Sequence, residues 1–261
     1  MSESPEGERD ETTPGQTGHG PSRPPPSAGL DDTSASAAQP PARRVVGQPA
    51  YSEDARSYDW MTGAYEGFRR AIVDALPVRP GQVVLDVGSG TGLCFGLLLE
   101  KVGPEGGVVG IEESPEMVAM ALERIEQEGW RNTTVLQSRA EDAEIALTAD
   151  AALFCAVHDI LQSRVALRNV MNHLRSGAWV AAGGGKWAAS WMLAVNLHRM
   201  ILHAPYVRSF EGFQRPWSHL EQLLEDVHVR ELGFGSGYIM TGHALPPARA
   251  SGGARSCGPA P

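Results

Sequence analysis

The sequence has few cysteines and few cationic side chains for its length. It contains three cysteines in 261 residues, and one lies in the C-terminal tail, so they do not form a disulfide framework. No His/Cys cluster has the spacing of zinc ligands, and we expect no metal. Lys and Arg number 22 against 31 Asp and Glu, a formal net charge of -9. We expect no nucleic acid partner, because phosphate contacts need a basic face.

The sequence also lacks the segments that direct a protein into or through a membrane. Met1 leads into acidic residues rather than a cationic stretch and an apolar core, so we expect no secretory signal and a cytoplasmic location. The most apolar helical segment, 190–204, is shorter than the roughly 20 residues that a membrane-spanning helix needs. We expect this helix to cover an active site, to form a homodimer contact or to touch a membrane surface. We favour these roles in that order, because the helix carries few Lys or Arg.

Composition divides the chain into two tails and one domain. Nine of the 19 prolines precede position 51, and almost no large apolar side chains lie between them. Such a segment cannot bury enough surface to offset its ordering entropy, so we expect residues 1–50 to be disordered. Residues 246–261 have the same character. Residues 51–245 remain, an ordinary size for a single core.

The most informative pattern is an apolar segment that runs into three alternating glycines. Val83–Val87 predicts a buried strand with Asp86 near its end, and Gly88, Gly90 and Gly92 follow. Glycines at every second position allow positive φ angles and let backbone N–H groups approach a ligand. A helix expected over 93–101 points its positive end at the same place. The pattern predicts a nucleotide-like cofactor.

The spacing of the glycines separates the two obvious cofactors. A dinucleotide fingerprint, G-x-G-x-x-G, needs a third glycine at position 93, where this chain has Leu93. The observed D-x-G-x-G-x-G resembles motif I of the class I S-adenosylmethionine (SAM) dependent methyltransferases. The resemblance extends over roughly 51–244. It implies SAM as cofactor, with contacts from the motif residues Asp86, Gly88, Ser89, Gly90 and Gly92.

A second apolar segment ends in an acid at the place where this family needs one. Residues 106–112 predict a turn and a strand that ends at Glu112, and Ser114-Pro115-Glu116 predicts the start of a helix that continues to about Glu128. In the family, an acid after this strand binds both ribose hydroxyls, and Glu112 matches that position better than Glu113. The alternative for Glu112 is a helix N-terminal charge favoured by the macrodipole.

Two further strands complete the expected cofactor edge. Residues 133–137 predict the third strand, and the loop 138–142 resembles the loop that borders the adenine. Many relatives have Gly-Asp-Ala where this chain has Ser138-Arg139-Ala140. The resemblance therefore assigns the adenine contact to Ala140 and Glu141, with Asp142 or the backbone alone as alternatives. Residues 150–157 predict a fourth strand that is too apolar to be exposed on either face, as parallel strands covered by helices are.

His158 and Asp159 follow the fourth strand, where open α/β sheets place ligands. The family often has a His or an aromatic residue here, which makes His158 the candidate catalytic base. The alternative is that His158 satisfies a backbone group at the end of a strand. Asp159 is expected to orient a ring or to hold a cationic substrate.

The remaining pattern predicts how the sheet closes. Residues 169–174 close a helix, Arg175-Ser176-Gly177 forms a turn, and 179–182 begins a fifth strand. Residues 227–234 and 238–244 are strand-like and flank Gly235-Ser236-Gly237, a hairpin signal. We expect a Rossmann-like, doubly wound α/β fold: a mostly parallel seven-stranded sheet with a C-terminal antiparallel hairpin.

Two aromatic segments are expected to select the methyl acceptor. Tyr58, Trp60 and Tyr65 precede the first strand in a helical region that resembles the lid helices of small-molecule methyltransferases, including the quinone C-methyltransferases. Trp187 and Trp191 open a helical insertion near 186–225. Aromatic faces suit a flat ring or a methylated ammonium.

Three hypotheses about function follow. The first is a SAM-dependent methyltransferase that acts on a small aromatic, quinone-like or amine acceptor. The second is a phospholipid head-group N-methyltransferase, favoured by the apolar helix at 190–204. The third is a non-catalytic SAM-binding protein, for which the departures from the family pattern at Arg139, Ser176 and Ala178 are the only support.

Overall fold

The computed structural model describes residues 65–204 and 207–246. They belong to the second of two compact units, Val45–Pro261; the first unit, Met1–Arg44, lies outside the described residues. The expected disorder of residues 1–50 and 247–261 and the expected substrate roles of Tyr58 and Trp60 also fall outside them.

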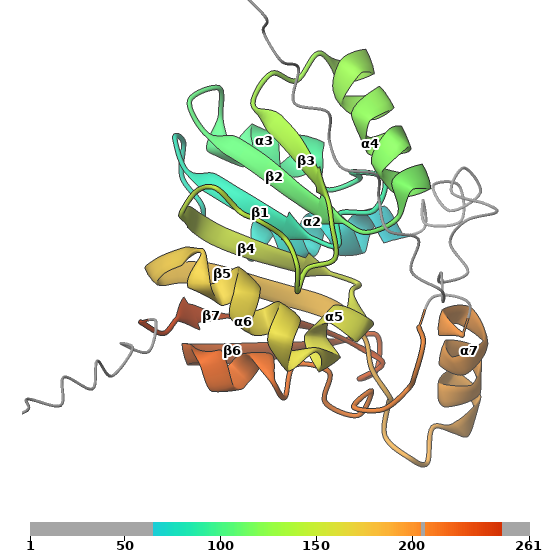
Figure 1. Ribbon diagram of the computed structural model, residues 1–261. Coiled ribbons are helices and arrows are strands. Elements are labelled where there is room, and N and C mark those ends of the chain that lie inside the picture. The colour runs from blue at the N-terminus through green and yellow to red at the C-terminus, as the bar shows by residue number, and fades with distance from the viewer. Residues whose placement is uncertain (1–64, 205–206, 247–261) are drawn as a thin grey trace, which may run out of the picture. The chain divides into compact units, whose positions relative to one another are not determined.

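A seven-stranded sheet forms the centre of the fold, in the order β3-β2-β1-β4-β5-β7-β6 (Figure 1). The first five strands are parallel, and β7 is antiparallel to both β5 and β6. The expected fold class is therefore confirmed. The strands are β1 (Val83–Val87), β2 (Gly107–Glu112), β3 (Thr133–Gln137), β4 (Ala149–Cys155), β5 (Leu174–Gly185), β6 (Leu224–Leu232) and β7 (Gly237–Ala244).

Helices cover both faces of this sheet (Figure 1). One buried cluster joins one face to α2 (Glu66–Asp74), α3 (Phe95–Val102) and α4 (Pro115–Glu128). A second cluster joins the other face to α5 (His158–Gln162) and α6 (Arg164–Asn172). The segment between β5 and β6 contains α7 (Leu193–His203) and a short 3-10 helix, Leu220–Leu223. Among the described residues, no helix has the length and apolar character needed to cross a membrane.

Helix α4 begins and ends as its sequence predicts. The Ser114 hydroxyl accepts a hydrogen bond from the Met117 amide at 3.3 Å, and Pro115 occupies the first helical position. Gly129 ends the helix in the left-handed conformation, with φ of 68°. This cap fixes the chain directly after β2, and therefore the position of Glu112.

The expected boundary between α6 and β5 is wrong by two residues. The helix ends at Asn172, and Leu174, which we assigned to the helix, is the first residue of β5 and pairs with Ala149. Leu174 is buried in the sheet, so strand pairing overrides its helix propensity. The expected turn at 175–177 lies within β5, where the register of β4 against β5 shifts and Gly177 has φ of 72°.

The sheet order places a crevice at the carboxyl end of β1. This strand lies between β2 and β4. After β1 the chain continues into α3 on one face of the sheet, and after β4 it continues into α5 on the other face. Ligands of open α/β sheets bind at such a switch point.

Candidate functional site

A cavity of about 480 Å³ opens at this edge of the sheet. Its volume lies within the roughly 300–1,000 Å³ typical of small-molecule sites. The loops after β1, β2, β3 and β4 line it, together with a segment that follows α7. The polar and glycine residues on its wall include Gly88, Gly90, Glu112, Glu113, Ser138, Arg139, Glu141, His158, Asp159, Gln162, Arg208 and His219.

The glycine-rich loop has the conformation that its sequence requires. Gly88, Gly90 and Gly92 have φ of 70°, 56° and 79°. A Cβ on Gly88 would lie 2.5 Å from Val157 Cγ1 and 2.9 Å from Ile160 Cδ1, both on the cavity wall. A Cβ on Gly92 would meet the ring of Phe95 at 2.7 Å. Gly88 therefore keeps the cavity open, whereas Gly92 permits α3 to pack against the loop.

Glu112 ties two of these loops together. Its Oε2 accepts a hydrogen bond from the Gly90 amide at 2.9 Å, and its Oε1 accepts one from the Ser114 amide at 2.9 Å. Burial raises the pKa of this carboxyl, and the two backbone hydrogen bonds oppose that rise. Each carboxylate oxygen has a second lone pair, so Glu112 retains two positions that can accept hydrogen bonds from vicinal hydroxyls.

Asp86 lies behind the glycine-rich loop and does not contribute to the cavity wall. Its side chain is buried, and Oδ2 has no hydrogen-bond partner among the described residues. Burial, and secondarily the charge of Glu112, raises its pKa to about 7. The Oγ of Ser89 is likewise buried without a partner in this part of the chain. A buried acid with one oxygen that lacks a partner, behind a loop that lines a ligand cavity, is suited to a cationic ligand.

The loop after β3 forms the opposite wall. Ala140, Glu141, Ser138 and Arg139 line the cavity. The Asn169 amide on α6 fixes this loop, because it donates to the carbonyl of Ala140 at 2.9 Å. The Arg139 guanidinium forms an ion pair with Glu141.

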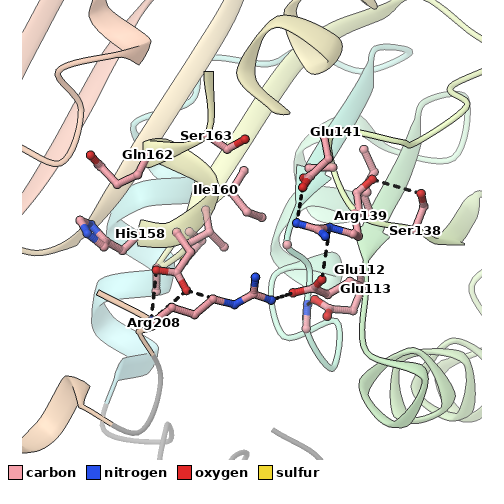
Figure 2. A pocket seen from close by; sticks show the side chains of 18 of the residues that line it. Glu112, Glu113, Ser138, Arg139, Glu141, His158, Ile160, Gln162, Ser163 and Arg208 are labelled. Carbon is pink, nitrogen blue, oxygen red and sulfur yellow. Dashed lines mark hydrogen bonds and ion pairs between the residues drawn. The ribbon is translucent and has the colours of Figure 1, made fainter. Parts of the chain in front are cut away.

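His158 begins α5 and is buried. Its Nε2 lies 2.9 Å from the carbonyl oxygen of Glu211. Because a carbonyl only accepts, Nε2 carries the proton, and the neutral ring has its lone pair on Nδ1. Burial lowers the pKa of His158, against the effects of the Glu211 hydrogen bond and the Asp159 charge. Figure 2 shows the ring pointing away from Glu112 and Arg139.

Two other residues after β4 shape the cavity. Asp159 accepts hydrogen bonds from the backbone amide of Arg208 at 3.1 and 3.3 Å. Ala156 has a φ of 59°, in a region that costs a residue with a Cβ roughly 1–2 kcal/mol. Strain of this kind concentrates at functional sites.

The expected substrate aromatics that the structure describes, Tyr65, Trp187 and Trp191, lie outside the cavity wall. Trp187 stacks on Phe210 with ring centroids 5.2 Å apart and meets Phe213 edge-on at 5.0 Å. Trp191, just before α7, is 80% exposed. Tyr65 is the N-cap residue of α2 and is partly buried. Of the expected substrate residues that the structure describes, Asp159 alone lines this cavity.

Several cavity residues had no signal in the sequence. Gln162 lies one turn after His158, so the helical period of α5 identifies it only once that helix is known. Arg208 and His219 come from the insertion, where no motif marks them. Glu113, assigned to an apolar position by the resemblance, lines the cavity and pairs with Arg208 at 2.8 Å.

These features fit SAM. Gly88 and Gly90 line the cavity without side chains, Glu112 offers free acceptor positions for ribose hydroxyls, and Asp86 is a buried acid without a partner for its Oδ2. The fold is that of the Rossmann-like methyltransferases. Residues 79–183 match a family model described as a methyltransferase domain.

Several known proteins resemble parts of the chain. It is 32% identical over 131 residues to an uncharacterized 37.1 kDa protein in transposon TN4556 of Streptomyces fradiae, covering 48% of this chain and 36% of that protein. It is 35% identical over 92 residues to the ubiquinone/menaquinone biosynthesis C-methyltransferase UbiE of Stenotrophomonas maltophilia, covering 33% of this chain and 36% of that protein. The chain spans about a third of the length of the curated relatives it matches.

A solved structure shows the same fold. The SAM-dependent methyltransferase from Aquifex aeolicus matches with a TM-score of 0.52 and 19% identity, covering 74% of this chain and 99% of that one. The match to UbiE places a quinone C-methyltransferase, the type that the sequence resemblance named, among the relatives of this chain.

Proposed function

We propose that this protein transfers a methyl group from SAM to a small-molecule acceptor that is aromatic, quinone-like or an amine. The observation that carries the proposal is the position of Glu112. It lines the cavity while it binds the Gly90 amide, so one carboxylate connects the glycine-rich loop to the expected ribose position.

Each wall of the cavity has a proposed role toward the cofactor. Glu112 accepts hydrogen bonds from the ribose hydroxyls, and Ala140 and Glu141 border the adenine. Gly88 and Gly90 let the backbone of the loop lie close to the amino-acid part, with the Asp86 carboxylate behind them. Ser89 and Gly92 support the loop, since neither lines the cavity.

SAM supplies a methyl group on a sulfonium, so the leaving group is a neutral thioether and needs no general acid. The protein then has to orient the acceptor in line and exclude water. A base is needed only where the acceptor must lose a proton. We propose His158 for that role, because its Nε2–H is held by the Glu211 carbonyl and its Nδ1, buried and without a partner among the described residues, retains a lone pair that a base needs.

The charges around the cavity support an uncharged or cationic acceptor. Two arginines line the wall, and carboxylates on the same wall engage both: Arg139 pairs with Glu141, and Arg208 pairs with Glu113. An anionic group would have to displace one of these carboxylates. This arrangement disfavours a phosphorylated head group as acceptor.

One observation favours the second candidate, a phospholipid head-group N-methyltransferase. The outer face of α7 is apolar and exposed, with Leu193 at 75% and Ile201 at 65%. The polar side chains of Asn196 and Arg199 instead anchor the helix to the domain, at Ala188 and Ser236. Flotation with vesicles of phosphatidylethanolamine tests this candidate. If the candidate is right, the protein rises with the vesicles.

The test of the proposal is S-adenosylhomocysteine (SAH) formation by the purified protein with three acceptors: a quinol, an aromatic amine and phosphatidylethanolamine vesicles. We expect SAH above the acceptor-free rate with a small molecule and not with vesicles. SAH formation with vesicles alone would favour the second candidate. Binding of SAM without turnover on any acceptor would favour a non-catalytic SAM-binding protein. The cytoplasmic location and the homodimer stay predictions.

A further inference from the structure

A segment after α7, residues 207–219, is fastened across the cavity by α5. Four of its residues line the cavity: Arg208, Ser209, Glu211 and His219. Three side chains of α5 bind its backbone at 2.9 to 3.1 Å, in the pairs His158–Glu211, Asp159–Arg208 and Gln162–Pro216. We call residues 207–219 the strap.

The side chain of Arg208 extends from the strap to the other wall. Its Nη2 donates to Glu113 Oε1 at 2.8 Å, and its Nε lies 4.0 Å from Asp159 Oδ2. Glu113 follows β2, whereas Asp159 follows β4. Figure 2 shows the guanidinium of Arg208 extending toward Glu113. Arg208 therefore bridges the two sides of the crevice at the switch point.

The bridge continues on the adenine side. Glu113 also lies 3.8 Å from Arg139, and Arg139 pairs with Glu141. The charged side chains form one row from α5 to the loop after β3 (Figure 2).

The bridge lies nearer to solvent than the expected cofactor contacts. The side chains of Arg208, Glu113 and Asp159 are 47%, 36% and 33% exposed, whereas Glu112 is 9% exposed. Ion pairs this exposed contribute little to folding. Such weak ion pairs are suited to a closure that opens and closes at a small cost in free energy. A closure of this kind is needed because the cofactor must enter the site and its product must leave.

We propose that Arg208 is a positioning residue that closes the cofactor site by bridging Glu113 and Asp159. This inference rests on the proposed function, since the molecules whose passage Arg208 controls are SAM and SAH. Loss of the bridge speeds both entry and exit, and it changes the equilibrium affinity much less than either rate.

The experiment is stopped-flow binding of SAH to the full chain, followed by tryptophan fluorescence. Trp187 is a suitable reporter because it stacks on Phe210 of the strap. We compare wild type, Arg208→Gln and the control Arg215→Gln. Arg215 lies on the same strap and pairs with Glu221 at 2.7 Å, but it is not on the cavity wall.

Arg208→Gln is expected to raise the association and dissociation rates of SAH about twofold to fivefold, the factor that corresponds to the strength of an exposed ion pair. Arg215→Gln should keep the wild-type rates. Glu113→Gln should reproduce the effect, and the double variant should add little, because both changes remove the same pair. High salt should move wild type toward the variant rates, since it screens exposed charges.

Rates in Arg208→Gln equal to those in Arg215→Gln would overturn the closure while leaving SAH binding intact. No SAH binding by wild type would instead overturn the proposed function and the closure with it. If Arg208→Gln fails to fold, as judged by its melting curve, Glu113→Gln and the salt dependence of wild type decide the matter in the same way.

Discussion

The carboxylate of Glu112 accepts a hydrogen bond from the amide of Gly90, 22 residues earlier in the chain, at 2.9 Å. This contact joins the ends of two adjacent parallel strands at the floor of the cavity. It holds the glycine-rich loop and the expected ribose contact in one geometry before any ligand arrives, and preorganisation of this kind favours tight binding.

Replacement of Glu112 should therefore weaken SAM binding. We expect Glu112→Ala to cost roughly 1–3 kcal/mol of binding free energy, the range for hydrogen bonds to a charged group. Isothermal titration calorimetry measures it. Glu116→Ala is the matched control, since it removes the same charge at the start of α4 from a residue that does not line the cavity. Unchanged SAM affinity in Glu112→Ala would remove the ribose assignment.

Gly88 should tolerate no side chain. In Gly88→Ala, both the φ of 70° and the close contacts of the new Cβ with Val157 and Ile160 lower the free energy of unfolding. In Gly81→Ala, only the φ of 86° lowers it, because no atom lies within 4 Å of the new Cβ. Urea denaturation should show a loss of roughly 1–2 kcal/mol for Gly81→Ala and about 1–3 kcal/mol more for Gly88→Ala. Gly88→Ala should also lose SAM binding, and equal losses in the two variants would contradict the clash.

The affinity for SAM should depend on the ionisation of Asp86. Burial raises its pKa to about 7, so the free protein holds a proton there below that pH. A cationic ligand favours the carboxylate and lowers its pKa, so SAM binding releases a proton and tightens as the pH rises toward 7. Calorimetry in buffers of different ionisation enthalpy measures the released proton. Asp86→Asn should bind SAM without this pH dependence, and a dependence that survives in Asp86→Asn belongs to another group.

The same pKa has a consequence for the ligand-free protein. Because the folded pKa of Asp86 lies above the ordinary value of 3.8, folding favours the protonated form. That contribution to stability is fully present below pH 3.8 and is lost as the pH rises through 7. The melting temperature of Asp86→Asn relative to wild type should therefore increase between pH 5 and pH 8. A constant difference would show that Asp86 ionises normally.

His158 should affect turnover and spare the cofactor. His158→Ala removes both the donor to Glu211 and the Nδ1 lone pair, whereas the amide of His158→Gln can still donate and has no basic nitrogen. We expect both variants to bind SAM as wild type does and to lose about 10²-fold or more in turnover, the usual contribution of a general base. Wild-type turnover in His158→Gln would reduce this residue to an anchor of the strap.

The sequence was most informative where local chemistry decides the structure. The alternating glycines, the Ser114 cap and the apolar strands are local signals, and β1, β3 and α4 follow them closely. The boundary at Leu174 was missed because pairing with Ala149 is a tertiary contact. The pair of Arg208 and Glu113 is separated by 95 residues, and no motif marks Arg208, so only the folded chain reveals it.

Transfer of a labelled methyl group is the decisive measurement for this protein. Wild type and Glu112→Ala are incubated with methyl-labelled SAM and a cell extract, and the products are separated into phospholipid and small-molecule fractions. We expect label in a small molecule with wild type and much less with Glu112→Ala. The proposed methyltransferase activity would be contradicted if the protein binds SAM and yet no fraction carries label with extracts from several growth conditions.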